Sequence, residues 1–252
     1  MKRLCSRSGL VLGILWLGVT NLATAGLFGF GGDSWQEEVL LHDGRKLLIT
    51  RSQTYGGRHE IGQPSPIKEH TVTFGLPGSD KTLTWTSEYG EELGRTNFHL
   101  LAVHVLNGTP YLVTEPNLCP SYNKWGRPNP PYVFFKYDGS AWQRIRLEEL
   151  PTEFTTLNVA ISLDMGHVKE MIRLGVVSAE EIRQRNSRLS QPEFRALLRL
   201  AVAANGISQT SCPIPTTAGA KLITPEVDGK PLYYNWWPLA AEWLKNTYGK
   251  VR

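Results

Sequence analysis

Hydrophobic and polar residues alternate along four pairs of short stretches, and a turn that contains glycine separates the two members of each pair. The turns fall at residues 42–45, 77–80, 107–108 and 138–139. Strict alternation indicates a strand with one face in a core, and a short glycine-containing turn between two such stretches indicates a β-hairpin. The pattern therefore predicts four consecutive hairpins.

The eight strands of these hairpins all lie before Pro151. Between the first two hairpins, residues 52–69 are polar and rich in glycine and proline, which predicts a long loop. A meander of this kind, packed as a sandwich or an open barrel, is expected for residues 35–150. The strands are expected at residues 39–41 and 46–50, 72–76 and 83–85, 98–106 and 111–114, and 132–137 and 142–147.

Spacing typical of helices replaces the alternation in the rest of the chain. Residues 165–174 predict one short helix, and Ser178 with Glu181 forms a capping box that predicts the start of a second. A third helix is expected from Pro192 to a stop at residues 205–206, because its apolar side chains recur at intervals of three and four. These side chains are Phe194, Leu197, Leu198, Ala201 and Val202.

The predicted helices need an apolar surface, and the hairpin sheet supplies one. We therefore expect an α+β fold, in which an antiparallel β-meander carries a helical and mixed subdomain at residues 151–252 that folds with it as one unit. Near the C-terminus, a fifth hairpin is expected about residues 228–229 with Pro231 on an edge strand, followed by a short helix at residues 239–248.

The N-terminus has the three parts of a secretory signal peptide. A positively charged segment ends at Arg7, an apolar run follows at residues 9–19, and a small-residue cleavage motif ends at Ala25. The apolar run is shorter than the ~20 residues that span a bilayer. We therefore expect cleavage after Ala25, a periplasmic location, a mature chain without a transmembrane segment, and a flexible glycine-rich leader at residues 26–34.

The charge balance argues against a nucleic-acid partner. The chain has 27 Lys and Arg residues against 23 Asp and Glu residues, but three of the basic residues precede Ala25, which leaves 24 against 23 in the mature chain. Binding to a polyanion needs a clustered basic face, and the sequence contains no such run.

Cys119 and Cys212 are the two cysteines of the mature chain. Because an exported protein meets an oxidising compartment, we expect one disulfide between them, with two unrelated thiols as the alternative. No metal site is expected, because neither cysteine has a Cys or His neighbour at ligand spacing. The sequence also lacks a P-loop and a dinucleotide-binding motif, so no cofactor is expected.

The proline-rich stretch after Cys119 is the main candidate for a binding surface. It mixes flat aromatic faces with amide and cationic donors, which suits stacking on a sugar or peptide while hydrogen-bonding its edge. The alternative is that Trp125 folds inward and the prolines stiffen a crossover to the next strand. The candidate ligand-binding residues are Tyr122, Asn123, Lys124, Trp125, Arg127 and Asn129.

A second candidate is the pair His59 and Glu60, which lies in a glycine-framed loop. An imidazole beside a carboxylate could act as an acid and a base. The alternative is a solvated loop whose glycines adopt positive φ angles.

Three segments carry a resemblance to a known family. They are Ser-Tyr-Asn-Lys-Trp-Gly-Arg-Pro-Asn-Pro-Pro-Tyr at residues 121–132, Trp-Gln-Arg-Ile at 142–145, and Gly-Arg-His-Glu-Ile-Gly at 57–62. Over about residues 35–191, the chain resembles a family of uncharacterised exported proteins of Gram-negative bacteria. The resemblance implies a location in the cell envelope and carries over no activity and no catalytic residue.

We therefore expect a non-enzymatic ligand-binding or interaction protein whose partner is an envelope glycan, peptide or protein. The alternative is a cell-envelope hydrolase that acts on glycan or peptide, with His59 and Glu60 as weak candidates for its acid and base.

Overall fold

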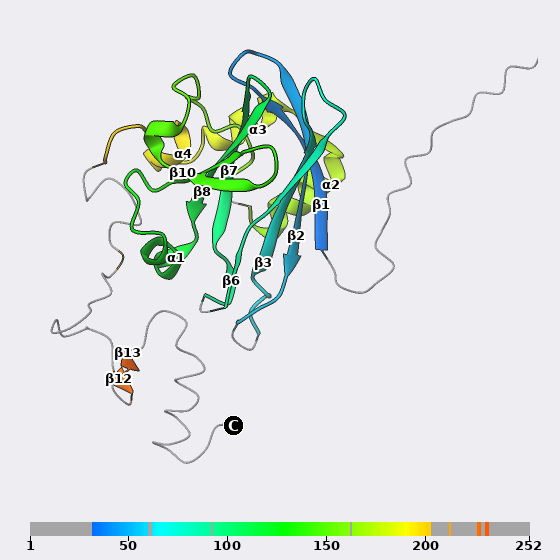
Figure 1. Cartoon of the computed structure of the whole chain (residues 1–252). Coiled ribbons are helices and arrows are strands. Elements are labelled where there is room, and N and C mark those ends of the chain that lie inside the picture. The colour runs from blue at the N-terminus through cyan, green and yellow to red at the C-terminus, as the bar shows by residue number, and fades with distance from the viewer. Residues whose placement is uncertain are drawn as a thin grey trace, which may run out of the picture. The chain divides into compact units, whose positions relative to one another are not determined.

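Two β-sheets packed face to face form the core of the protein (Figure 1). Apart from one short parallel edge pair, neighbouring strands are antiparallel, and the described part of the chain contains no closed barrel. The predicted α+β fold with an antiparallel core is therefore confirmed. The computed structural model describes residues 32–59, 62–91, 93–161, 163–202, 212, 226–227 and 230–231.

The first sheet has five strands. In spatial order they are β11 (Val176–Val177), β1 (Gly32–Leu40), β2 (Lys46–Tyr55), β3 (Ile67–Gly75) and β4 (Thr82–Thr86). Its outer face is rich in threonine, and the hydroxyls of Thr71 and Thr73 pair with those of Thr86 and Thr84 across β3 and β4. Its inner face is buried, as the alternation along each strand predicts.

The second sheet has four strands. In spatial order they are β10 (Trp142–Ile145), β9 (Val133–Tyr137), β8 (Thr109–Pro116) and β7 (Phe98–Leu106). A short separate pair, β5 (Tyr89–Gly90) and β6 (Arg95–Thr96), precedes β7, and the helix α1 (Leu118–Lys124) connects β8 to β9. All four predicted hairpin turns are therefore confirmed.

Aromatic side chains fill the space between the two sheets. Phe98 is buried and its ring lies 6.4 Å from that of Trp85, 5.5 Å from that of Phe135 and 4.8 Å from that of Trp125, measured between centroids. Each fully buried side chain of this size contributes about 1.5–3 kcal/mol through the hydrophobic effect. The contact with Trp125 joins the α1 region to the core.

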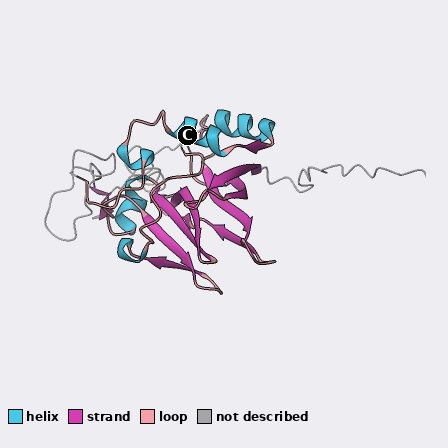
Figure 2. Ribbon diagram, turned by 90° about the horizontal axis from the view of Figure 1, so that it is seen from above, coloured by secondary structure: helices cyan, strands magenta, loops and turns pink. Residues whose placement is uncertain are grey.

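The helices lie around the strands rather than between the sheets (Figure 2). The helices α2 (Met165–Leu174) and α3 (Ala179–Asn186) pack against β1 through a small apolar cluster that includes Trp35 and Met171. The outer side of the second sheet is covered by Phe154 and by residues near α4 (Pro192–Arg195). The short 3-10 helix η1 (Leu147–Glu149) follows β10 and precedes Phe154.

The first two predicted helices are confirmed, but the third is wrong beyond its first turn. α4 ends at Arg195, and Ala196 has an extended backbone with φ −154° and ψ 157°. The amide of Leu197 donates to the carbonyl of Thr155 at 3.2 Å, and the amide of Leu198 to the hydroxyl of Tyr132 at 3.5 Å. Tertiary hydrogen bonds thus replace the helical ones.

The predicted loop at residues 52–69 is also wrong in extent, because β2 continues to Tyr55 and β3 begins at Ile67. Likewise β1 begins at Gly32, inside the predicted leader. In the fifth hairpin, β12 (Glu226–Val227) pairs with β13 (Lys230–Pro231), as expected. The signal peptide and the helix at residues 239–248 lie outside the described residues.

Candidate functional site

The predicted disulfide is present and anchors the candidate binding surface. Cys119, in α1, is bonded to Cys212, with a Cα–Cα distance of 5.2 Å across a sequence separation of 93 residues. Ser121, also in α1, donates its hydroxyl to the carbonyl of Asn97 at 2.6 Å. The hydrogen bond holds α1 against the segment that leads into β7, and the disulfide links the helix to residue 212.

Trp125 follows α1 and packs partly inward. One side of the indole contacts Phe98 in the core. Two cations also lie over the ring, with the guanidinium carbon of Arg144 at 5.2 Å and the Nζ of Lys124 at 5.7 Å from its centroid. Trp125 is therefore folded inward only in part. It contacts the core through Phe98, and its ring also lies near two exposed cations.

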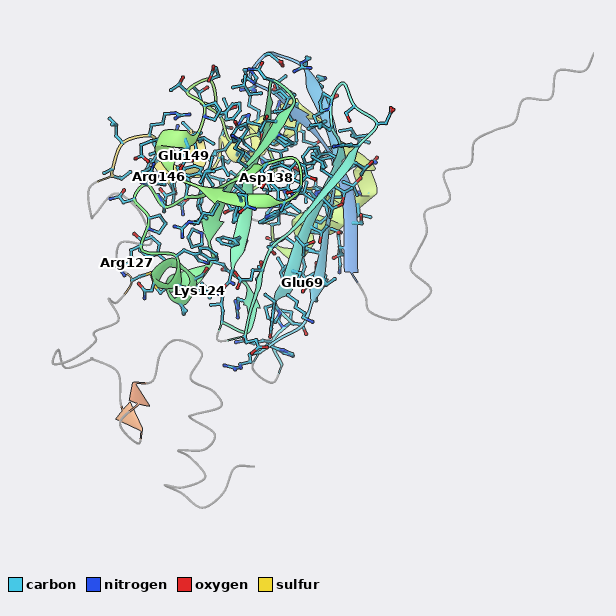
Figure 3. All side chains as sticks on the ribbon, in the orientation of Figure 1. Glu69, Lys124, Arg127, Asp138, Arg146 and Glu149 are labelled. Carbon is cyan, nitrogen blue, oxygen red and sulfur yellow. A yellow bond between two sulfur atoms is a disulfide. The ribbon has the colours of Figure 1, made fainter. Side chains whose placement is uncertain are left out.

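Other residues of the predicted surface are held by contacts among themselves. Tyr122 is only 2% exposed, and burial raises the pKa of its hydroxyl. The guanidinium of Arg127 lies 5.1 Å from the Tyr122 ring and donates to Oδ1 of Asn123 at 2.6 Å. Figure 3 shows Lys124 and Arg127 beside α1. The structure thus brings five of the six predicted residues together.

Asn129 has a different role. Its Nδ2 donates to the carbonyl of Val202 at 2.9 Å and its Oδ1 accepts from the amide of Val202 at 2.8 Å. The side chain therefore completes a backbone-like pair with the segment after α4. This use of both amide atoms makes Asn129 a structural residue in the described chain.

His59 is exposed, and its Nδ1 lies 3.0 Å from the carbonyl oxygen of Gly57. Its predicted partner Glu60 lies outside the described residues. The backbone of this loop requires glycine at position 57. Gly57 has φ +95°, and a Cβ there would lie 2.0 Å from the carbonyl oxygen of Gly94. The close approach allows the amide of Arg58 to donate to that same oxygen at 3.1 Å.

A buried polar group that the sequence analysis missed occupies the end of the inner face near this loop. We call it the His70 group; it consists of Gln53, His70, Arg95, Asn97 and His99. Gln53 and His70 are direct cross-strand neighbours on β2 and β3, and they are 2% and 4% exposed. The ring of His99 lies 5.7 Å from that of His70, in an edge-to-face arrangement.

Several polar atoms of the His70 group are buried without a hydrogen-bond partner. They are both ring nitrogens of His70, Oε1 of Gln53, Nε of Arg95 and Nδ2 of Asn97. Buried polar atoms in folded proteins are hydrogen-bonded in the great majority of cases. The described residues contain other such atoms, but five of them fall in the His70 group, which makes it a candidate for binding a ligand.

A buried ion pair with several further hydrogen bonds lies next to this group. Arg51 donates through Nη1 to Oε1 of Glu37 at 2.9 Å and to the carbonyl of Ala160 at 2.8 Å. Oε1 of Glu37 also accepts from the indole of Trp35 at 2.7 Å, and its Oε2 accepts from the amide of Ala160 at 3.0 Å. This pair holds residue 160 against the first sheet.

Both histidines of the group are kept neutral. Burial lowers the pKa of His70 well below its ordinary value, and the electrostatic interactions with His99 and Arg51 act in the same direction. Burial also lowers the pKa of His99, against the opposing effect of its hydrogen bond with Asn117, with Arg51 and Arg95 adding to the decrease. Neutral imidazoles offer one donor and one acceptor each.

The alternation of inward-facing positions continues to this group, but the polar composition of the stretch led to the prediction of a loop. Gln53 and His70 occupy alternating inward positions of β2 and β3, where polar side chains gave the stretch the composition of a loop. Extending the alternation of residues 47 and 49 to residues 51 and 53 would have located it.

No family model, no curated protein and no solved structure matches the chain. Within the described ranges, no cluster of three or more His, Cys, Asp or Glu side chains could hold a metal ion. None of the helices in those ranges is long and apolar enough to cross a membrane.

Proposed function

We propose that the protein is exported to the periplasm, belongs with the exported family that it resembles, and acts as a binding protein rather than a catalyst. The signal-peptide pattern ending at Ala25 supports export. Its ligand contacts the surface formed by α1, the turn after it and β10, which we call the Trp125 surface. The partner is an envelope glycan or peptide that carries carboxylates.

The convergence of Lys124 and Arg144 on the Trp125 ring is the observation that carries this proposal. Both cations are exposed, and the indole beside them is half-buried. An aromatic edge next to two cations fits a ligand that combines an apolar face with a negative charge. Arginine is suited to binding a carboxylate through two parallel hydrogen bonds.

The donors for such a ligand are in place before it binds. Arg144 uses Nη2 to donate to the carbonyl of Trp125 at 3.1 Å, which fixes the guanidinium beside the ring and leaves its other N–H groups for a ligand. Lys124 pairs with Glu88 at 2.8 Å, but both side chains are about half exposed. Exposed pairs of this kind contribute about 0–1 kcal/mol, so an acidic ligand can displace Glu88.

The surface is also rigid, which favours binding. The disulfide at Cys119 and the hydroxyl of Ser121 anchor α1 to two other segments of the chain. The amide of Arg127 donates to the carbonyl of Tyr122 at 2.9 Å and closes the turn after the helix. A site that is ordered before the ligand arrives loses less conformational entropy on binding.

Titration of the mature protein with peptidoglycan fragments, uronic-acid oligosaccharides and acidic peptides, followed by tryptophan fluorescence, tests this function. We expect a saturable change, and binding weakened about tenfold in Arg144→Gln, because a hydrogen bond to a charged group is lost. Arg146→Gln is the matched control, since it removes the same charge from an exposed position two residues away.

Equal affinities for Arg144→Gln and Arg146→Gln would refute the proposed surface. Hydrolysis of any of these compounds that disappears in His59→Ala would instead support the alternative of an envelope hydrolase. The variant Trp125→Phe keeps the core contact with Phe98 and removes the reporting indole, so it assigns the fluorescence change to this surface.

A further inference from the structure

We propose that the His70 group is a second binding site, for a small oxyanion such as a carboxylate, sulfate or phosphate. It involves none of the residues of the Trp125 surface, so the inference stands independently of the function proposed above.

Most of the unpaired atoms of the group are hydrogen-bond donors. Nε of Arg95 and Nδ2 of Asn97 can only donate, and a neutral His70 donates through one ring nitrogen. The acceptors are Oε1 of Gln53 and the other ring nitrogen of His70. An oxyanion accepts from several donors at once, and one that retains a hydroxyl or a proton also donates to Gln53.

The orientation of the Gln53 amide is set by its neighbours. Its Nε2 donates to the hydroxyl of Tyr55 at 2.6 Å, and this hydroxyl donates to Oδ2 of Asp33 at 2.5 Å. Because the carboxylate can only accept, the chain of hydrogen bonds runs in one direction. Oε1 of Gln53 is therefore the atom that is left for a ligand.

The charges that act on the two imidazoles are positive. Arg51 acts on both rings and Arg95 acts on His99. The carboxylates of the surrounding strands have other partners, since Glu37 binds Arg51 and Asp33 binds Tyr55. Glu115 is paired with His99 in the register of β7 and β8 and is 7% exposed. A buried position with cations and free donors stabilises an anion.

His99 and Arg95 form the side of the group that is nearest to solvent. His70, Gln53 and Asn97 are buried, whereas His99 and Arg95 are half-buried. The close approach of Gly57 to Gly94 fixes the turn that carries Arg95. An anion that enters beside His99 therefore meets donors held in place by the fold.

Binding should depend on pH, because an anion favours the protonated form of a neighbouring imidazole. The free protein keeps His70 and His99 neutral against the charges of Arg51 and Arg95. An anion offsets those charges and raises both pKa values in the complex. The affinity should therefore increase as the pH falls from about 7.5 to about 5.5.

Calorimetric titration of the purified mature protein with sulfate, phosphate and acetate, at constant ionic strength, tests the site. We expect saturable binding that is tighter at the lower pH, together with chemical-shift changes of the His70 and His99 rings in NMR spectra. Arg95→Gln should weaken binding about tenfold, since it removes a charged donor. Arg173→Gln, which removes an exposed cation from α2, should bind like the wild type. Circular dichroism establishes that each variant is folded.

The three anions distinguish the source of the ligand, because binding of acetate alone assigns a carboxylate compound and binding of sulfate and phosphate alone assigns a tetrahedral oxyanion. Absence of saturable binding for all three would overturn the proposal, as would equal affinities for Arg95→Gln and Arg173→Gln. Tight binding of Zn²⁺ that is lost in His99→Ala and unaffected by Arg95→Gln would replace it with a metal site. Neither result bears on Arg144→Gln, so the two sites are tested separately.

Discussion

Asn158 and Val103 exchange two hydrogen bonds across a separation of 55 residues. Oδ1 of Asn158 accepts from the amide of Val103 at 2.9 Å, and its Nδ2 donates to the carbonyl of Val103 at 2.9 Å and to the carbonyl of Leu40 at 3.0 Å. Val103 lies on β7 at the edge of the second sheet, and Leu40 ends β1 of the first. The side-chain amide of Asn158 therefore covers part of the edge of the second sheet at β7 and joins the two sheets.

Asn158→Ala should lower the free energy of unfolding by about 2–4 kcal/mol, because it leaves three backbone groups unpaired at a mostly buried position. Urea denaturation followed by circular dichroism measures the change. Asn158→Asp keeps the acceptor for the Val103 amide but places a carboxylate beside the carbonyls of Val103 and Leu40, so it should destabilise the protein at least as much as Asn158→Ala. A loss of less than about 0.5 kcal/mol in Asn158→Ala would show that the bridge is not needed.

Glu37→Gln should destabilise the protein by about 3–5 kcal/mol, because it leaves the charge of Arg51 buried without a partner. Arg51 and Glu37 are 3% and 0% exposed, and the guanidinium also donates to the carbonyl of Ala160. The double variant Glu37→Gln with Arg51→Met removes the unpaired charge and should recover part of the loss. Additive effects of the two substitutions in urea denaturation would contradict this coupling.

Cys212→Ser should lower the free energy of unfolding by about 4–5 kcal/mol in the chain-entropy model, since the disulfide closes a loop with a separation of 93 residues. It should also increase proteolysis near α1, because Cys119 anchors that helix. A reducing agent should make the wild type behave like the variant. Equal proteolysis of oxidised wild type and Cys212→Ser would refute the anchoring role.

The hairpins were predictable because their information is local. Gly108 follows Asn107 in a turn where both residues have positive φ angles, a backbone conformation that this pair adopts readily. The flanking strands β7 and β8 then follow from alternation and length. The apolar spacing after Pro192 was equally regular, yet Leu197 and Leu198 reach the same apolar cluster from an extended backbone. Periodicity identified Leu197 and Leu198 as core-facing but not their conformation, and it also selected Ala201, which is exposed.

The two candidate sites also differ in how much of each can be predicted from the local sequence. Composition pointed to Lys124 and Trp125 as a surface, but Arg144 comes from β10 and meets them only through the fold. Composition did not predict the His70 group, because its buried polar residues have the composition of a loop. Its members come from β2, β3, β6 and β7. Alternation along β2 marks residue 53 as inward-facing, but the fold decides which residues of the other strands lie beside it.

The stability of the protein should decrease as the pH falls from about 6.5 towards about 4, and His104 provides one physical reason. His104 is fully buried, its Nε2 lies 3.0 Å from the carbonyl of Thr156, and its ring stacks on Phe154 at 4.4 Å. Burial lowers its pKa to about 4, with the nearby His42 adding to the decrease and the Thr156 carbonyl opposing it.

The sign follows from the two protonation equilibria. In the unfolded chain His104 takes up a proton near pH 6.5, whereas in the folded protein it does so only near pH 4, so acid favours unfolding between these values. At about pH 4.5 this one group should make the protein about 2 kcal/mol less stable than at about pH 7. His70 and His99 act in the same direction, because burial lowers their pKa values too.

Urea denaturation of the wild type and His104→Phe at about pH 7 and about pH 4.5 isolates the contribution of this residue. The phenylalanine keeps an aromatic contact with Phe154 but cannot take up a proton, so the difference in stability between the two pH values should be about 2 kcal/mol smaller than in the wild type. His167→Phe is the control, because His167 is exposed on α2. If His104→Phe and His167→Phe lose stability equally with acid, the buried imidazole is not the group that responds to pH.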